Sequence, residues 1–150
     1  MSEPRAPRPR ATVATIVARD GRFLLVEERT DGGVRINQPA GHLEAGETIV
    51  AGAARETLEE TGYRVAPSGL VGIYRWQSPA GETFIRFAFA ADVVAHEAER
   101  PLDAGILRAL WLSYDELASL RARHRSPIVM RCVDDYLAGV RRPLDLVTEL

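Results

Sequence analysis

The sequence predicts an α/β fold in which a mixed β-sheet is sandwiched between helices, an α/β/α arrangement. Runs of β-branched residues are separated by glycine and proline turn signals, which is typical of strands. One long alanine-rich segment, Thr48–Thr61, is typical of a helix. Because strands and helices follow one another in an irregular order, we expect the sheet to be mixed and covered by helices on both faces.

The first predicted element is a β-hairpin. Thr12–Arg19 and Arg22–Glu28 are expected as strands, and Asp20-Gly21 between them is a hairpin turn signal. Residues 30–33 and 37–47 are expected as loops, the second because it is dense in proline and glycine. The hairpin is therefore expected to lead through irregular chain into the helix.

The helix and the elements after it carry their own start and stop signals. Thr48 can cap the first turn of the helix, and Gly62 stands where a left-handed residue ends it. Ser113–Glu116 has the pattern of a capping box that opens a short helix. Ser126, as cap, precedes a last predicted helix at Pro127–Ala138. Three more strands are expected at Arg64–Trp76, Thr83–Val94 and Leu107–Leu112, the first two joined by a turn at Ser78–Gly81.

Length and composition indicate one soluble globular domain. The chain has 150 residues, 46% of them hydrophobic and 27% charged. Residues 1–10, with three prolines and three arginines, are expected as a disordered leader, and residues 11–150 as a single domain. The net charge of -2 excludes the basic stripe that a partner such as duplex nucleic acid requires.

The cysteine content and the lengths of the apolar runs indicate where in the cell the protein acts. A single cysteine, Cys132, rules out an internal disulfide and a thiolate metal cluster, and we expect it to be a small buried hydrophobe. No run approaches the roughly 18 apolar residues of a membrane span, and no apolar export signal begins the chain. We therefore expect a cytoplasmic protein without membrane contact, and a monomer rather than a homodimer.

Three glutamates on the predicted helix indicate a metal site. Glu56, Glu59 and Glu60 are spaced i, i+3 and i+4, which places their carboxylates on one helix face. Like charges so close repel, and a divalent cation removes the repulsion. An all-oxygen set favours Mg²⁺ over Zn²⁺, with Mn²⁺ as a second possibility. From this spacing alone a solvated acidic face is the favoured interpretation.

The residues around the glutamates favour the metal site. The pattern runs from Gly41 through five residues to Glu47, through seven to Arg55-Glu56, through two to Glu59-Glu60, and ends at Gly62-Tyr63. This spacing resembles the Nudix box, the signature of a hydrolase family with its own mixed-sheet fold. Thr57 departs from the pattern, because the family usually has a larger apolar residue there, which puts packing in question but not catalysis.

The resemblance implies roles for the residues that match the box. Glu59 and Glu60 would bind the metal, and Glu56 would bind metal or act as the base that activates water. The backbone carbonyl of Ala40 would be a further ligand. Arg55 would orient Glu56 by an ion pair. The structural positions implied by the resemblance are Gly41 for a close backbone approach, Glu47 for the loop–helix junction, and Gly62.

A further acid and three substrate contacts are predicted outside the box. Asp103 is the candidate for a second base or ligand, although the family more often has the acid two positions later, where Gly105 stands. Gln38, Trp76 and Arg86 are the candidate substrate-binding residues. Each has a plainer interpretation as well, since Trp76 is equally suited to packing and Arg86 to an outward-facing charge on its strand.

Segments outside the box resemble the NudJ phosphatase branch of this family. The matching segments are Asn37–Glu44, Trp76 with Pro79, Phe84–Phe87, Arg125–Pro127 and Arg141–Leu144. The branch implies hydrolysis of nucleoside tri- and diphosphates, or of hydroxymethylpyrimidine pyrophosphate, with release of orthophosphate. Pro79 alternatively marks a pyrophosphatase for ADP-ribose or another nucleoside diphosphate derivative, or is a plain turn proline. A non-catalytic nucleotide-binding regulator is the alternative of a different class.

Overall fold

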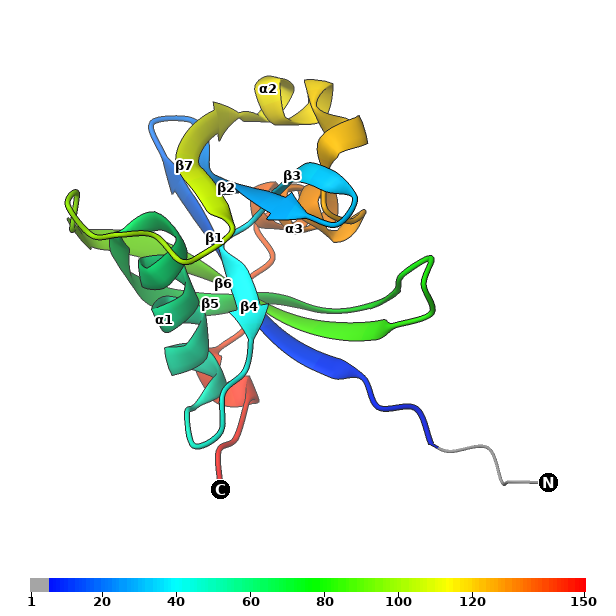
Figure 1. Cartoon of the computed structure of the whole chain (residues 1–150). Helices are drawn as coiled ribbons and strands as arrows, with labels where there is room; N and C mark the ends of the chain where they lie inside the picture. Colours follow the sequence, from blue (N-terminus) through cyan, green and yellow to red (C-terminus); the bar gives the residue numbers. More distant parts are fainter. Residues whose placement is uncertain (1–5) are drawn as a thin grey trace.

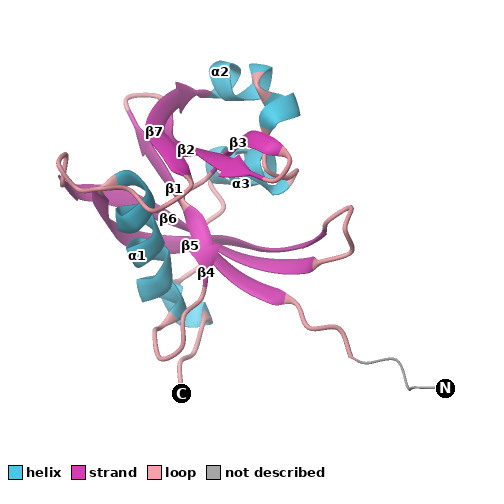
Figure 2. Ribbon diagram, viewed as in Figure 1, coloured by secondary structure: helices cyan, strands magenta, loops and turns pink. Residues whose placement is uncertain are grey.

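A mixed β-sheet organises the fold (Figures 1 and 2). The computed structural model describes residues 6–150, so residues 1–5 of the predicted leader lie outside it. Within the described part, seven strands form a sheet whose main path is β3-β2-β1-β6-β5, with β4 paired to β1 and β7 paired to β2. The strands are β1 (Arg10–Arg19), β2 (Arg22–Thr30), β3 (Gly33–Asn37), β4 (Ala40–His42), β5 (Tyr63–Gln77), β6 (Thr83–His96) and β7 (Ile106–Ser113).

The helices are few and short. They are α1 (Ile49–Thr61), α2 (Tyr114–Ser119) and α3 (Ile128–Leu137), with 3-10 turns η1 (Arg121–Arg123) and η2 (Leu144–Leu146). Over residues 6–150, none of them is long and apolar enough to cross a membrane.

The central strand β1 shows why helices cover both faces. It pairs parallel with β6 and antiparallel with β2 and β4, so the sheet is mixed as expected. Val13 packs in a cluster with Ala53 of α1, whereas Ala14 and Ile16 pack in a cluster with Val129 of α3. Because neighbouring strand residues point to opposite faces, α1 and α3 lie on opposite sides of the sheet. The predicted α/β/α arrangement is confirmed.

Most local signals at turns and caps are also confirmed, but α3 begins at Ile128 with Pro127, not Ser126, in the cap position. Asp20 and Gly21 have φ angles of 53° and 73°, the left-handed pair that a tight hairpin turn requires. The Thr48 side chain accepts a hydrogen bond from the Ala51 N–H, and Gly62 ends α1 at φ 76°. The capping box that begins at Ser113 is present with both of its hydrogen bonds.

Two strands and one boundary differ from the prediction. β4 occupies a segment expected as loop, and β3 forms mainly between the two expected loops, where no element was predicted. Neither has a long enough run of β-branched residues to be recognised locally. β4 is Ala-Gly-His, and its extended form depends on pairing with β1. β1 begins at Arg10, inside the predicted leader, because Arg10 pairs with Phe84 of β6 and its guanidinium lies 2.7 Å from the Glu82 carboxylate.

Candidate active site

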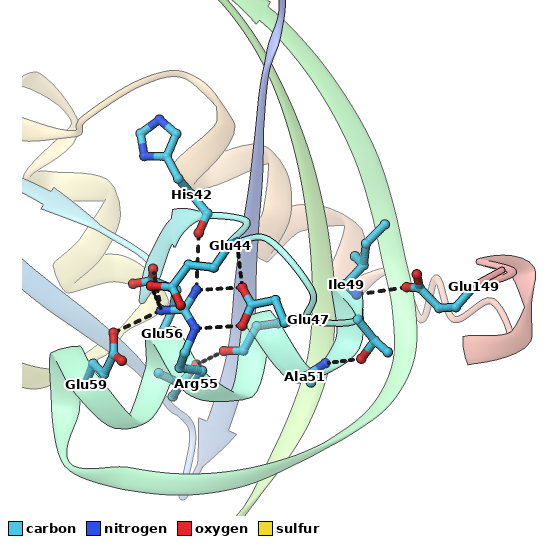
Figure 3. Close-up of polar contacts among 12 residues, drawn as sticks. His42, Glu44, Glu47, Ile49, Ala51, Arg55, Glu56, Glu59 and Glu149 are labelled. Carbon is cyan, nitrogen blue, oxygen red and sulfur yellow. Dashed lines mark hydrogen bonds and ion pairs between the residues drawn. The ribbon is translucent and has the colours of Figure 1, made fainter.

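Helix α1 and strand β4 bring the predicted box residues together (Figure 3). Gly41 of β4 lies directly against Glu56 of α1, because a Cβ at Gly41 would stand 2.2 Å from the Glu56 carboxyl carbon. While Glu56 keeps this orientation, only glycine fits the contact, in agreement with the predicted close backbone approach. Gly62 at the other end of α1 is equally confined, since a Cβ there would lie 2.9 Å from the Glu97 carbonyl oxygen.

Arg55 donates hydrogen bonds to three carboxylates at the acidic face. Its Nε and Nη2 donate to the two carboxylate oxygens of Glu47, each at 2.7 Å, in a bidentate pair. Its Nη1 donates to Glu56 Oε1 and Glu59 Oε2, both at 3.0 Å (Figure 3). The bond from Arg55 holds the pKa of Glu47 below its usual range. Arg55 therefore ties the loop before the helix to two of the three clustered carboxylates, and fixes the orientation of both.

Glu56, Glu59 and Asp103 form an oxygen cluster that fits a hard cation. One carboxylate oxygen from each can be chosen so that all three lie within 4.8 Å of one another. Asp103 comes from the loop before β7, and its backbone N–H donates to the Glu59 carbonyl at 3.0 Å, which anchors that loop to α1. A set of carboxylates without cysteine or histidine is the kind of donor set that Mg²⁺ prefers.

Glu60 lies beside this cluster but in a more buried place. Its Oε1 accepts a hydrogen bond of 2.8 Å from the Ala40 backbone N–H. Burial raises the pKa of Glu60 to about 9, and burial likewise raises the pKa of Glu56 despite its bond to Arg55. Two neighbouring carboxylates with raised pKa values are unfavourable in their charged forms. A divalent cation bound between them would favour those charged forms, so this arrangement fits a cation site. The role of the Ala40 carbonyl stays a prediction.

A cavity of about 780 Å³ opens beside these carboxylates. Glu56 and Glu60 line it, together with Ala40 and Gly41. Trp76 and Phe84, on neighbouring strands β5 and β6, form a stacked pair with ring centroids 5.9 Å apart and also line it. The cavity thus combines an acidic region with an aromatic surface of the kind that can receive a planar ring. Trp76 lies where a substrate contact was predicted.

The structure corrects two sequence interpretations next to this cavity. Arg86 does not point outward, because it is only 6% exposed and lines the cavity. Gln38 is not placed to touch a substrate, since it is 1% exposed and both ends of its amide are bonded inside the protein. Its Nε2 donates to the Val129 carbonyl at 2.8 Å, and its Oε1 accepts from Arg86 at 2.8 Å.

Several cavity residues were missed because they lie outside the box and come together only through the pairing of strands. Glu28 ends up near Glu60 only through the hairpin, and Asn37 through β3. Arg35, Arg125 and Ser126 line the cavity as well. The similarity of Arg125–Pro127 to one branch of the family was the signal in the sequence for Arg125 and Ser126.

Comparison with known proteins gives consistent results. The model of the NUDIX domain matches residues 7–131. The chain is 40% identical over 141 residues to phosphatase NudJ of Escherichia coli (strain K12), covering 93% of this chain and 91% of that protein. Phosphatase NudJ of Shigella boydii serotype 4 (strain Sb227) shows the same identity and coverage.

Solved structures show the same fold. A NUDIX hydrolase from Nitrosomonas europaea superimposes with a TM-score of 0.93 at 47% identity, covering 95% of this chain and 98% of the other. An ADP-ribose pyrophosphatase from Streptococcus suis gives a TM-score of 0.65 at 17% identity, with coverage of 86% and 92%. At that identity the second similarity speaks for the fold alone.

Proposed function

This chain belongs to the NUDIX domain family, and on that premise we propose that it is a Mg²⁺-dependent hydrolase of nucleoside tri- and diphosphates or of hydroxymethylpyrimidine pyrophosphate, which releases orthophosphate. That the chain is a Nudix hydrolase follows from the family match and from the NudJ relatives. The metal, the substrates and the bond that is cleaved are the proposal. Its main support is the cluster of Glu56, Glu59 and Asp103 beside a cavity of about 780 Å³.

The residues would divide the work by position. We propose Glu56, Glu59 and Glu60 as metal ligands, with the Ala40 carbonyl as a further one. Bound Mg²⁺ would supply charge neutralisation at the diphosphate and a lowered pKa for the attacking water. Arg55 acts as a positioning residue, because its Nη1 bonds hold Glu56 and Glu59 in their present orientation.

The base and the ring contact are assigned on the same grounds. Glu56 is proposed as the base or as a metal ligand, since Arg55 orients its carboxylate within the acidic cluster where an activated water would stand. Asp103, which shares the cluster, is the alternative base or a ligand. Trp76 would stack on the base or pyrimidine of the substrate. We also propose that residues 11–150 form the catalytic domain and that Arg10 adds the first residue of β1 to it. The protein would act as a monomer in the cytoplasm.

ADP-ribose or another nucleoside diphosphate derivative is a second candidate substrate. It is retained because Pro79, the residue that hints at it, lines the same cavity. Pro79 also lies in a turn closed by the Gly81 N–H, which donates to the Ser78 carbonyl at 2.8 Å. The turn accounts for the proline without any substrate, so the nucleoside phosphates remain the first choice.

A substrate panel tests the proposal. The protein is incubated with Mg²⁺ and nucleoside tri- and diphosphates, the pyrimidine pyrophosphate, ADP-ribose and 5′-triphosphate RNA, and orthophosphate and pyrophosphate are measured separately. We expect orthophosphate release, lowered by roughly a hundredfold or more in Glu59→Gln. Glu99→Gln, an exposed carboxylate in the loop after β6, is the matched control and should keep full activity.

The outcomes separate the parts of the proposal. No turnover of any substrate, with wild type equal to Glu59→Gln, would refute the hydrolase. Pyrophosphate in place of orthophosphate would refute the branch assignment, and preferred cleavage of ADP-ribose would select the second candidate.

A further inference from the structure

Arg86 is a buried cation without a matching anion. It lies on β6 and is 6% exposed. Within residues 6–150, no carboxylate oxygen lies within 4.0 Å of its guanidinium, although twelve other ion pairs of that kind are formed there. Taking a charge out of water is costly unless an opposite charge or a full set of hydrogen bonds compensates. Among the described residues Arg86 therefore keeps its charge without an ion-pair partner, and it lines the cavity.

Two neutral side chains accept hydrogen bonds from the guanidinium, and the buried thiol of Cys132 lies close to it as well. Arg86 Nη1 donates to Gln38 Oε1 at 2.8 Å, and Nη2 donates to Asn37 Oδ1 at 2.9 Å. The Gln38 amide cannot turn around, because its Nε2 donates to the Val129 carbonyl of α3. These two acceptors use two of the five N–H donors of a guanidinium. The charge is thus oriented by groups that do not neutralise it.

Arg86 shares the cavity with other positively charged groups. Arg35 and Arg125 line the same cavity, as do Ser126 and Ile128 at the N-terminal end of α3, where the helix dipole is positive. Glu28 lies at this end too: its Oε1 stands 3.7 Å from Arg125 Nε and accepts from Asn37 Nδ2 at 3.5 Å, so it offsets the charge of Arg125 and not that of Arg86. The other acidic lining residues are held by other groups or lie at the metal end: Glu82 is paired with Arg10, Glu44 lies 3.4 Å from Arg55, and Glu56 and Glu60 belong to the metal site.

We propose that Arg86, positioned by Asn37 and Gln38, forms an anion subsite that binds a phosphoryl group of the substrate and the orthophosphate product. This inference rests on the proposed function, because a phosphate bridging the cavity would meet the cation at the acidic end and Arg86 at the other. A guanidinium fork matches the geometry of a phosphate with two parallel hydrogen bonds. The amide oxygens of Asn37 and Gln38 accept from Arg86 without cancelling its charge, so the fork keeps its attraction for an anion.

Phosphate binding without metal tests the subsite apart from turnover. Inorganic phosphate is titrated into the chelator-treated protein by calorimetry, and the arginine Nε–H signals are followed by NMR. We expect saturable binding that shifts one signal, assigned to Arg86 by its absence in Arg86→Lys. Arg86→Gln should weaken binding by roughly ten- to a hundredfold, the usual worth of charge-assisted hydrogen bonds. Arg86→Lys should fall between, because it keeps the charge but loses the fork.

Two controls make the test specific. Arg75→Gln removes an exposed arginine on β5 that does not line the cavity, and it should bind phosphate as wild type does. Glu59→Gln should abolish turnover but keep phosphate binding. Failure of the proposed hydrolase activity can therefore be distinguished from failure of the proposed anion subsite. Absence of saturable binding in wild type would overturn the inference, even if the enzyme is active. Wild-type phosphate affinity in Arg86→Lys or in Arg86→Gln would overturn it as well. If Arg86→Gln fails to fold, the affinity of Arg86→Lys still decides the question.

Discussion

At the scale of single residues, Thr57 explains the one departure from the Nudix box. It is fully buried on α1, and its Oγ1 lies 2.7 Å from Oγ1 of Thr15, which is fully buried on β1. Thr57 also donates to the Ala53 carbonyl at 2.8 Å, so the proton in the pair comes from Thr15. A polar pair replaces the apolar contact that the family pattern implies, and it joins α1 to the central strand β1.

This pair gives a prediction about stability. Thr57→Val leaves the Thr15 hydroxyl buried without its acceptor, and we expect it to lower the free energy of unfolding by roughly 1–3 kcal/mol. Thr15→Val should cost less, because Thr57 still donates to Ala53. The double variant should recover part of the loss, since two valines of similar shape can pack together. Urea unfolding of the four proteins measures the coupling, and strict additivity would contradict a direct interaction.

At the scale of elements, Glu27 joins three segments. It lies on β2, is 8% exposed, and its carboxylate pairs with Arg108 of β7 and with Arg123 of η1 at 3.1 Å. Burial alone would raise the pKa of Glu27, but the bonds from the two arginines outweigh it and hold the pKa below its ordinary value of 4.5. The two arginines thereby hold β7 and η1 against the hairpin.

The lowered pKa predicts sensitivity to acid. A group whose pKa is depressed in the folded state contributes stability above its unfolded pKa and loses it as pH falls toward the folded value. Glu27→Gln should therefore be less stable than wild type near neutral pH, and the difference should shrink as pH falls below about 4.5. Thermal unfolding from pH 7 to pH 3 measures it, with Glu99→Gln as the exposed control. A constant difference across this range would show that Glu27 acts through packing alone.

Elements were predictable where their signals are local. Thr48 and Gly62 mark the ends of α1 because capping and left-handed φ depend on neighbouring residues only. β4 was missed because three residues, Ala-Gly-His, carry no strand pattern and become extended by pairing with β1. The same difference separates the parts of the site. Glu56 and Glu59 share a helix face by spacing alone, whereas the contact of Arg86 with Asn37 spans 49 positions and depends on the whole sheet.

At the scale of the whole molecule, the candidate metal site connects α1 to the loop that leads into β7. Glu56 and Glu59 come from the helix and Asp103 from the loop, and their closeness raises the pKa of Glu56 further beyond the effect of burial. Without a cation, this repulsion works against the contact between the two segments. The Asp103 N–H bond to the Glu59 carbonyl, at 3.0 Å, holds them together in spite of it.

Cation binding should therefore stabilise the fold as well as permit catalysis. At a Mg²⁺ concentration about a hundredfold above its Kd, linkage adds roughly 2.7 kcal/mol to the free energy of unfolding. For a chain of this size that corresponds to a rise in Tm of roughly 5–10 °C. Scanning calorimetry after chelation, with and without Mg²⁺, measures the rise. Asp103→Asn should reduce it if Asp103 is a ligand, while Glu99→Gln should show it in full. An undiminished rise in Asp103→Asn would remove Asp103 from the ligand set and leave the proposed metal site to α1 and the Ala40 carbonyl.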